Sequence, residues 1–255
     1  MTAQTKSATP SLSLSRLQTF YNDFAPEALL RVMIRQEFPE RIALLSSFGA
    51  DSALLLAMAA EVDKNLPVLF LETGKHFHKT LEYVEQVRDM LGLTNIIYLK
   101  PRADMLSRID ADGTLWQHQP NRCCWLRKVE PLNRALEEGG YQALITGRKR
   151  YQTENRQKMD PIEMGEDNVF RINPLWNFTR EDINNEMQRR GLPQHPMVAQ
   201  GYRSIGCEPC TAPVGEGQDE RAGRWQHTGR FPGAQKSECG IHVPAAAEAV
   251  QGWEI

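Results

Sequence analysis

The sequence lacks any apolar run of the roughly 18 residues that a helix needs to cross a bilayer, so it predicts no membrane association through a spanning helix. It also lacks an excess of charge of one sign, with 30 Lys and Arg against 32 Asp and Glu and a formal net charge of −2. Binding to nucleic acid or to an anionic membrane needs a basic surface, so both function classes are disfavoured. A local basic pocket for a small anion is compatible with this balance.

The amino-terminal end lacks the apolar core of a secretory signal, because residues 1–14 are rich in Ser and Thr. We expect a disordered leader there and a cytoplasmic protein. Cysteine is scarce and odd in number, with Cys123, Cys124, Cys207, Cys210 and Cys239. In a reducing compartment this pattern predicts metal binding or thiol chemistry in preference to disulfides.

Short apolar runs alternate with amphipathic segments, which predicts βαβ units and an α/β fold: a doubly wound, mostly parallel sheet flanked by helices. We expect strands at 41–47, 67–71, 96–99 and 141–146, and helices within 17–38, 53–62, 78–91, 129–136 and 180–190, the last with Thr179 as N-cap. Residues 15–210 are predicted to form this domain. Residues 211–255 are rich in Gly, Pro and charge and are predicted to be a mobile tail.

In such a sheet, ligands bind beyond the carboxyl ends of the strands, where we expect the turns 46–52, 72–74 and 147–150. The turn Ser47-Phe-Gly-Ala-Asp-Ser52 stands between an expected strand and an expected helix. Gly49 permits close backbone approach, and successive N–H groups at the helix start can bind an anion. The segment could also be an ordinary turn with Asp51 or Ser52 as helix cap. Its pattern resembles the pyrophosphate loop of the adenine-nucleotide α-hydrolase superfamily.

The cysteine pairs Cys123-Cys124 and Cys207-Glu-Pro-Cys210 suggest one metal centre. Adjacent cysteine side chains diverge, so both reach one centre only if it is wide. A cubane iron-sulfur cluster offers separate corners and suits this arrangement better than a single Zn²⁺ does. Tetrahedral zinc is the competing interpretation, and four buried thiols are the weaker structural alternative.

The fifth cysteine, Cys239, lies in the predicted tail, where a thiol could swing into and out of a site. A nucleophilic thiolate is favoured by nearby positive charge. The basic residues near it in the sequence are Arg221, Arg224, Arg230, Lys236 and His242. On these residues alone, an incidental exposed cysteine is the simpler interpretation.

Taken together, the motifs resemble the bacterial assimilatory adenylyl-sulfate (APS) reductases. The resemblance runs from about residue 41 to 242 and is carried by the segments 46–52, 71–74, 123–128, 146–150, 206–210, 220–225 and 238–242. The two cysteine pairs and the late Glu-Cys-Gly are specific in combination. Reductases for 3′-phosphoadenylyl sulfate (PAPS) generally lack these pairs, so the resemblance favours APS.

The resemblance implies thioredoxin-dependent reduction of APS to sulfite and AMP in assimilatory sulfate reduction, through an S-sulfocysteine on Cys239. It implies a [4Fe-4S] cluster held by Cys123, Cys124, Cys207 and Cys210, with Lys128 between cluster and substrate. The implied adenylate-binding residues are Ser46, Ser47, Phe48, Gly49, Leu71, Thr73 and Gly147. The implied phosphosulfate-binding residues are Lys128, Arg148, Arg221, Arg224 and His242.

Three alternatives stay open at this point. The first is PAPS reduction. The second is a pyrophosphate-loop ATPase with a structural zinc site. The third is a non-enzymatic iron-sulfur sensor that binds adenine nucleotides and needs no Cys239. The oligomeric state is not predicted.

Overall fold

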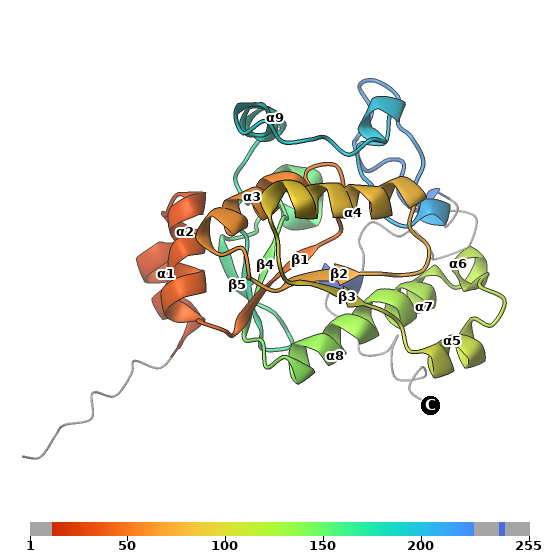
Figure 1. Ribbon diagram of the computed structural model, residues 1–255, viewed down its shortest axis with the longest axis horizontal. Helices are drawn as coiled ribbons and strands as arrows, with labels where there is room; N and C mark the ends of the chain where they lie inside the picture. Colours follow the sequence, from red (N-terminus) through yellow and green to blue (C-terminus); the bar gives the residue numbers. More distant parts are fainter. Residues whose placement is uncertain (1–11, 227–239, 243–255) are drawn as a thin grey trace, which may run out of the picture.

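The structure, a computed structural model, describes residues 12–226 and 240–242. Within them, six strands form one sheet in the order β3-β2-β1-β4-β6-β5 (Figure 1). All neighbouring strands run parallel except β5 and β6. The strands are β1 (Ile42–Ser46), β2 (Val68–Leu71), β3 (Ile96–Leu99), β4 (Ala143–Thr146), β5 (Ile162–Met164) and β6 (Phe170–Ile172). The mostly parallel, doubly wound α/β fold predicted from the sequence is confirmed.

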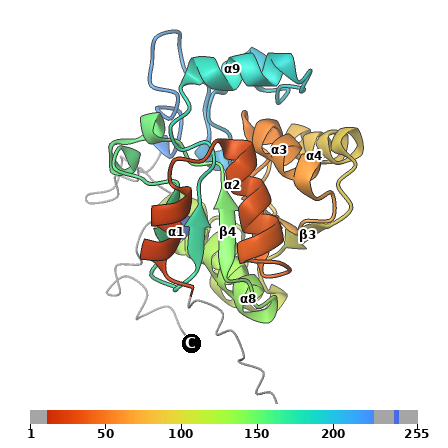
Figure 2. The same cartoon turned by 90° about the vertical axis from the view of Figure 1, so that its left-hand side faces the viewer.

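Helices cover both faces of the sheet (Figures 1 and 2). The α-helices of the described residues are α1 (Leu14–Tyr21), α2 (Pro26–Val32), α3 (Ser52–Val62), α4 (His78–Leu91), α5 (Ala103–Ile109), α6 (Leu115–His118), α7 (Pro120–Cys124), α8 (Glu130–Glu138) and α9 (Arg180–Arg189). Alternate strand residues point to opposite faces. Leu44 of β1 belongs to the core that contains α3 and α4, whereas its neighbour Leu45 packs in the core that contains Leu132 of α8.

The topology places a crevice at one edge of the sheet. From β1 the chain winds outward to β2 and β3, then returns across the sheet to β4, on the other side of β1. The connections therefore leave β1 and β4 in opposite directions at their carboxyl ends. Such a switch point is where open α/β sheets bind ligands. The predicted binding edge coincides with it.

Helix α9 begins where the sequence predicts. The Thr179 Oγ1 accepts a hydrogen bond from the Asp182 N–H at 3.1 Å, and the Asp182 carboxylate accepts one from the Thr179 N–H at 2.8 Å. This reciprocal capping box satisfies two N–H groups at the helix start. The predicted N-cap is confirmed, and the position of Arg180, the first helical residue, is fixed.

The segment before α8 differs from the prediction. The expected helix at 129–136 is preceded by a π-helical turn, η2 (Trp125–Val129), which continues α7. Pro131 lies in the first turn of α8, directly after this π-helical turn. The cysteine pair at the end of α7 and the basic residues of η2 therefore lie on one nearly continuous helical rod.

Part of the predicted tail packs on the domain. The Ala212 N–H donates to the Gly223 carbonyl at 2.8 Å, and the Trp225 N–H donates to the Cys210 carbonyl at 3.0 Å. Trp225 is only 3% exposed. The leader up to residue 11 and residues 227–239 and 243–255 lie outside the described residues. Within the described ranges, no helix combines the length and apolar character that crossing a membrane requires.

Candidate active site

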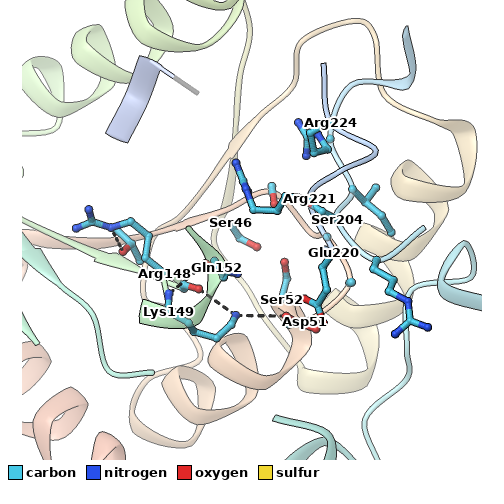
Figure 3. Close-up of a pocket in the computed structure, with 18 of the residues that line it drawn as sticks. Ser46, Asp51, Ser52, Arg148, Lys149, Gln152, Ser204, Glu220, Arg221 and Arg224 are labelled. Atoms are coloured by element: carbon cyan, nitrogen blue, oxygen red, sulfur yellow. Dashed lines mark hydrogen bonds and ion pairs between the residues drawn. The ribbon is translucent and has the colours of Figure 1, made fainter. Parts of the chain in front are cut away.

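A cavity of about 250 Å³ lies at the carboxyl ends of β1 and β4 (Figure 3). It collects segments that are far apart in the sequence. The predicted substrate-binding residues that line it are Ser46, Ser47, Gly49, Leu71, Lys128, Gly147, Arg148, Arg221 and Arg224. The structure thus brings the phosphate-loop turn, the exit of β4 and the basic residues of 221–224 around one space.

The turn after β1 is held by Phe48. Its side chain is fully buried and packs edge-on against Phe70, with ring centroids 5.4 Å apart. Its backbone φ is +45°, a conformation that costs energy for a residue other than glycine. Gly49 follows, where an added Cβ would lie 3.3 Å from the Ser47 Oγ and 3.4 Å from the Ile205 carbonyl. Phe48 therefore anchors the turn from behind, outside the cavity wall.

One other predicted residue, Thr73, lies away from this cavity. Thr73 is fully buried and lies beside the cysteines, with its Oγ1 3.4 Å from the Cys207 Sγ. It does not line the cavity at the ends of β1 and β4. The side chain of His242 and the whole of Cys239 fall outside the described residues. Ile241, which stands between them in η8 (Gly240–His242), lines the cavity.

Arginines of the cavity wall are supported by neighbours. Arg148 donates to the Glu163 carboxylate at 2.7 Å and to the Thr146 hydroxyl at 3.2 Å. The Arg224 guanidinium stacks on Trp225, 4.5 Å from the ring centroid. It also lies against Gly206, where an added Cβ would come within 2.2 Å of the Arg224 Nη2. The glycine before Cys207 therefore leaves room for this guanidinium.

A second set of charged residues lines the same cavity and was not predicted from the sequence as part of the site. Its members are Asp51, Lys149, Arg156, Arg180 and Glu220. Asp51 does not cap α3 through its side chain, which was one sequence interpretation. Its carboxylate instead accepts from the Arg180 Nη1 at 2.6 Å and pairs with the Lys149 Nζ at 3.3 Å.

Burial alone would raise the pKa of Asp51, but Lys149 and Arg180 outweigh it and hold that pKa below its ordinary value. Lys149 is 3% exposed, and burial lowers its pKa although Asp51 counteracts the effect. The pair gives the floor of the cavity a fixed arrangement of charge. The sequence places Lys149 after the expected strand at 141–146 and Arg180 at the start of the expected helix at 180–190. No sequence pattern indicates that either residue contacts Asp51.

The four paired cysteines line a second, smaller cavity next to the first. All four are buried thiols. Burial, together with the neighbouring Cys207, raises the pKa of Cys123 to about 11 and of Cys210 to about 12. Lys128 and Trp225 line both cavities. The described residues include no three His, Cys, Asp or Glu side chains close enough together to hold a single metal ion.

A buried ion pair supports the cysteine cavity. The Arg127 guanidinium, in η2, bonds the Asp110 carboxylate through Nε at 3.1 Å and Nη2 at 2.5 Å, and its Nη1 donates to the Thr73 carbonyl at 2.7 Å. The Asp110 side chain is completely buried, and that of Arg127 is 8% exposed. The pair joins η2 to the end of α5, and the bond to the Thr73 carbonyl joins η2 to the turn that follows β2.

We expect Asp110→Ala to lower the free energy of unfolding by about 3–5 kcal/mol, because it leaves the Arg127 charge buried without its carboxylate. Equilibrium urea unfolding followed by circular dichroism measures the change. Asp104→Ala is the matched control, since it removes a carboxylate from an exposed pair with Arg102 and should change stability little. Equal effects of the two variants would contradict the assignment.

The sheet order, the phosphate-loop turn and the cavity at the switch point define a nucleotide α-hydrolase-like α/β protein. Residues 41–213 match the family model described as phosphoadenosine phosphosulfate reductase domain, and the chain belongs to this family. The resemblance inferred from the motifs is confirmed.

Relatives with curated names cover nearly the whole chain. The adenosine 5′-phosphosulfate reductase of Chelativorans sp. is 44% identical over 245 residues, 96% of each chain. That of Mesorhizobium japonicum is 45% identical and covers 89% of this chain and 86% of its own. The phosphoadenosine 5′-phosphosulfate reductase of Gloeobacter violaceus is 36% identical over 91% of this chain and 94% of its own.

Solved structures agree with the fold. The PAPS reductase of Candida auris, in a phosphate complex, superposes with a TM-score of 0.67 at 26% identity, over 80% of this chain and all of that one. The FMN adenylyltransferase of Candida glabrata superposes with a TM-score of 0.54 at 15% identity, over 82% of this chain and 71% of that one. At that identity the second likeness concerns the fold alone.

Proposed function

We propose that the protein reduces APS to sulfite and AMP, with Cys239 as nucleophile and thioredoxin or a similar dithiol as reductant. One observation carries the proposal: a phosphate-loop turn and the cations Lys128, Arg221 and Arg224 line one cavity, with Ile241, two residues after Cys239, in its wall. The names of the most similar relatives above support APS as substrate. A cytoplasmic location fits this chemistry and stays a prediction.

Binding would use the two halves of the cavity differently. The hydroxyls of Ser46 and Ser47 and the backbone N–H groups of the Gly49 turn suit the adenylate phosphate. Leu71 and Gly147 offer apolar and backbone surface to the adenosine. The guanidinium groups of Arg221 and Arg224 and the ammonium group of Lys128 suit the phosphosulfate. Their role is to neutralise and position an anion before it meets a thiolate.

The reaction balances as a two-electron reduction. The Cys239 thiolate attacks the sulfur of APS, and the bond from that sulfur to the phosphate oxygen breaks, so AMP leaves as an anion. The sulfo group is then carried as an S-sulfocysteine. A reductant thiolate attacks the Cys239 sulfur, releasing sulfite and forming a mixed disulfide. The second thiol of the reductant resolves this disulfide and supplies the second electron equivalent.

The cysteine cavity fits an iron-sulfur cluster. Four buried thiols surround one space, and Lys75, Arg127 and Lys128 bring positive charge to it. Cys123, Cys124, Cys207 and Cys210 would be the four ligands, as in Cys₄ ligation of a [4Fe-4S] centre. Bound there, the cluster would supply a fixed charge next to Lys128, and the resemblance implies that it passes no electrons during turnover. Lys128 would orient substrate from the wall that both cavities share.

PAPS is the alternative substrate, because a relative that is 36% identical over 91% of this chain is named as a PAPS reductase. The two cysteine pairs and the two relatives at 44% and 45% identity favour APS. Comparison of kcat/KM for the two nucleotides decides between them.

We expect the protein, mixed with APS in the absence of a reductant, to gain about 80 Da, the mass of one sulfo group. Peptide mass spectrometry should place the group on Cys239, because the other four cysteines are buried and line the second cavity. The unreacted protein and a sample treated with dithiol, which should lose the added mass, are the controls. Absence of the gain, or its location on another cysteine, would reject the mechanism.

A further inference from the structure

We infer that Arg180 is a positioning residue that ties the phosphate-loop turn to the segment 219–225, which carries Arg221 and Arg224. The inference rests on the proposed function for the identity of the ligand. The inferred link fixes the position of Arg221 and Arg224, the proposed sulfo-binding residues, relative to the phosphate-loop turn. The resemblance assigns no role to Arg180.

Arg180 bonds two carboxylates from distant parts of the chain. Its Nη1 donates to the Asp51 Oδ1 at 2.6 Å, and its Nε donates to the Glu220 Oε1 at 2.6 Å. The Arg180 Nη2 also donates to the Glu220 Oε2, so the contact with Glu220 is two-pronged. Asp51 lies two residues after Gly49 in the turn, and Glu220 directly precedes Arg221. A single guanidinium therefore joins both halves of the cavity.

The base of this link is rigid. Arg180 is the first residue of α9, whose start is fixed by the capping box of Thr179. Its guanidinium lies over the ring of Tyr151, 5.5 Å from the centroid. The second oxygen of Asp51 pairs with the buried Lys149. Because Arg180 and Asp51 are themselves held, the link transmits position from the core to the segment 219–225.

The contact between Arg180 and Glu220 affects substrate binding through Arg221 and Arg224, which follow Glu220 in the chain. Figure 3 shows Glu220 beside Asp51 and Ser52, with Arg221 and Arg224 on the same side of the cavity. Arg221 and Arg224 both approach Trp225, at 5.6 and 4.5 Å from its ring centroid. The segment that carries both guanidinium groups is held at Glu220, whose carboxylate accepts from Arg180. Loss of the link should release the arginines, whereas Asp51 in the phosphate-loop turn keeps its contact with Lys149.

The test compares APS with AMP, which lacks the sulfo group. In a Cys239→Ser background APS binds without reacting, so equilibrium dissociation constants can be measured for both nucleotides. We expect Arg180→Gln to weaken APS binding by about tenfold more than AMP binding. Glu220→Gln should produce the same selective loss, and the double variant should add little, because both changes break one link. Arg180→Lys keeps the charge with a single bond and should be intermediate.

Arg190→Gln is the matched control. Arg190 follows the last residue of α9 and pairs with Glu27 and Glu186, and it does not line the cavity. It should leave the ratio of APS to AMP affinity unchanged. Equal weakening of both nucleotides by Arg180→Gln would mean a merely structural role and would overturn the inference.

Hydrogen exchange gives a readout that needs no nucleotide. Backbone amides of 219–225 should exchange several-fold faster in Arg180→Gln and at the wild-type rate in Arg190→Gln. Unchanged exchange in Arg180→Gln would also overturn the inference. If the wild-type protein neither turns over APS nor distinguishes it from AMP, the proposed function fails, while the exchange experiment still decides whether Arg180 holds the segment.

Discussion

Cys239→Ser is expected to abolish sulfite release, lowering the rate by about 10⁴-fold or more. A serine hydroxyl ionises far less readily than a thiol and is a poor nucleophile toward sulfur without a neighbouring base. The measurement is sulfite release from APS with thioredoxin or a small dithiol as reductant. The thiol is the group that changes, and the size of the side chain is nearly preserved.

The same variant supplies its own controls. AMP affinity should be unchanged, because the predicted adenylate-binding residues that line the cavity lie in the described domain, on β1, β2 and the exit of β4. Metal content and visible absorbance should also be unchanged, since the four cysteines of the second cavity remain. Turnover near the wild-type rate would reject Cys239 as nucleophile and return the non-enzymatic sensor to consideration.

Cys210→Ser is expected to remove the metal centre. The Cys210 side chain packs with Cys207 and Trp225 in a small apolar cluster, so a serine would fit but would replace a soft thiolate by a weak ligand. The wild-type protein, prepared without oxygen, should be brown, with broad absorbance near ~400 nm from thiolate-to-iron charge transfer. The variant should lose that absorbance together with iron and acid-labile sulfide.

Metal analysis of the same samples distinguishes an iron-sulfur cluster from a structural zinc site. Cys239→Ser is the matched control, because it removes a cysteine that is not among the four lining the cavity, and it should stay brown. A colourless wild-type protein with stoichiometric zinc would overturn the cluster and favour a structural zinc site. A brown Cys210→Ser with full iron content would exclude Cys210 as a ligand.

The architecture around the site could be predicted because it depends on local patterns. The buried runs that became β1, β2 and β4 are continuous stretches of apolar residues, and the residue types at 179–182 are those of a capping box. The hairpin of β5 and β6 was missed because each strand has only three residues. The available sequence signal was the apolar residues Ile162, Met164 and Phe170 on either side of Asn168, a residue type that tolerates the φ of +57° it adopts.

The charges of the site were only partly predictable. Residues in recognisable motifs, such as Gly49 or Arg221, could be assigned from the sequence. Phe48 stands in the same motif, yet its ring packs into the core, and which way a turn residue points depends on the core that forms behind it. The bond from Arg180 to Asp51 joins residues 129 positions apart, and no local pattern specifies such a contact. The π-helical turn at Trp125–Val129 likewise has no simple sequence signature.

The wall between the two cavities has a thermodynamic consequence. Lys128 and Trp225 line both spaces, so an occupant of either one changes the surroundings of the other. Binding linkage is reciprocal: if filling the cysteine cavity changes nucleotide affinity by some factor, nucleotide must change the retention of that occupant by the same factor. Nucleotide affinity, measured by titration with the cysteine cavity filled and then emptied, thus reports the coupling energy between the two cavities without any turnover.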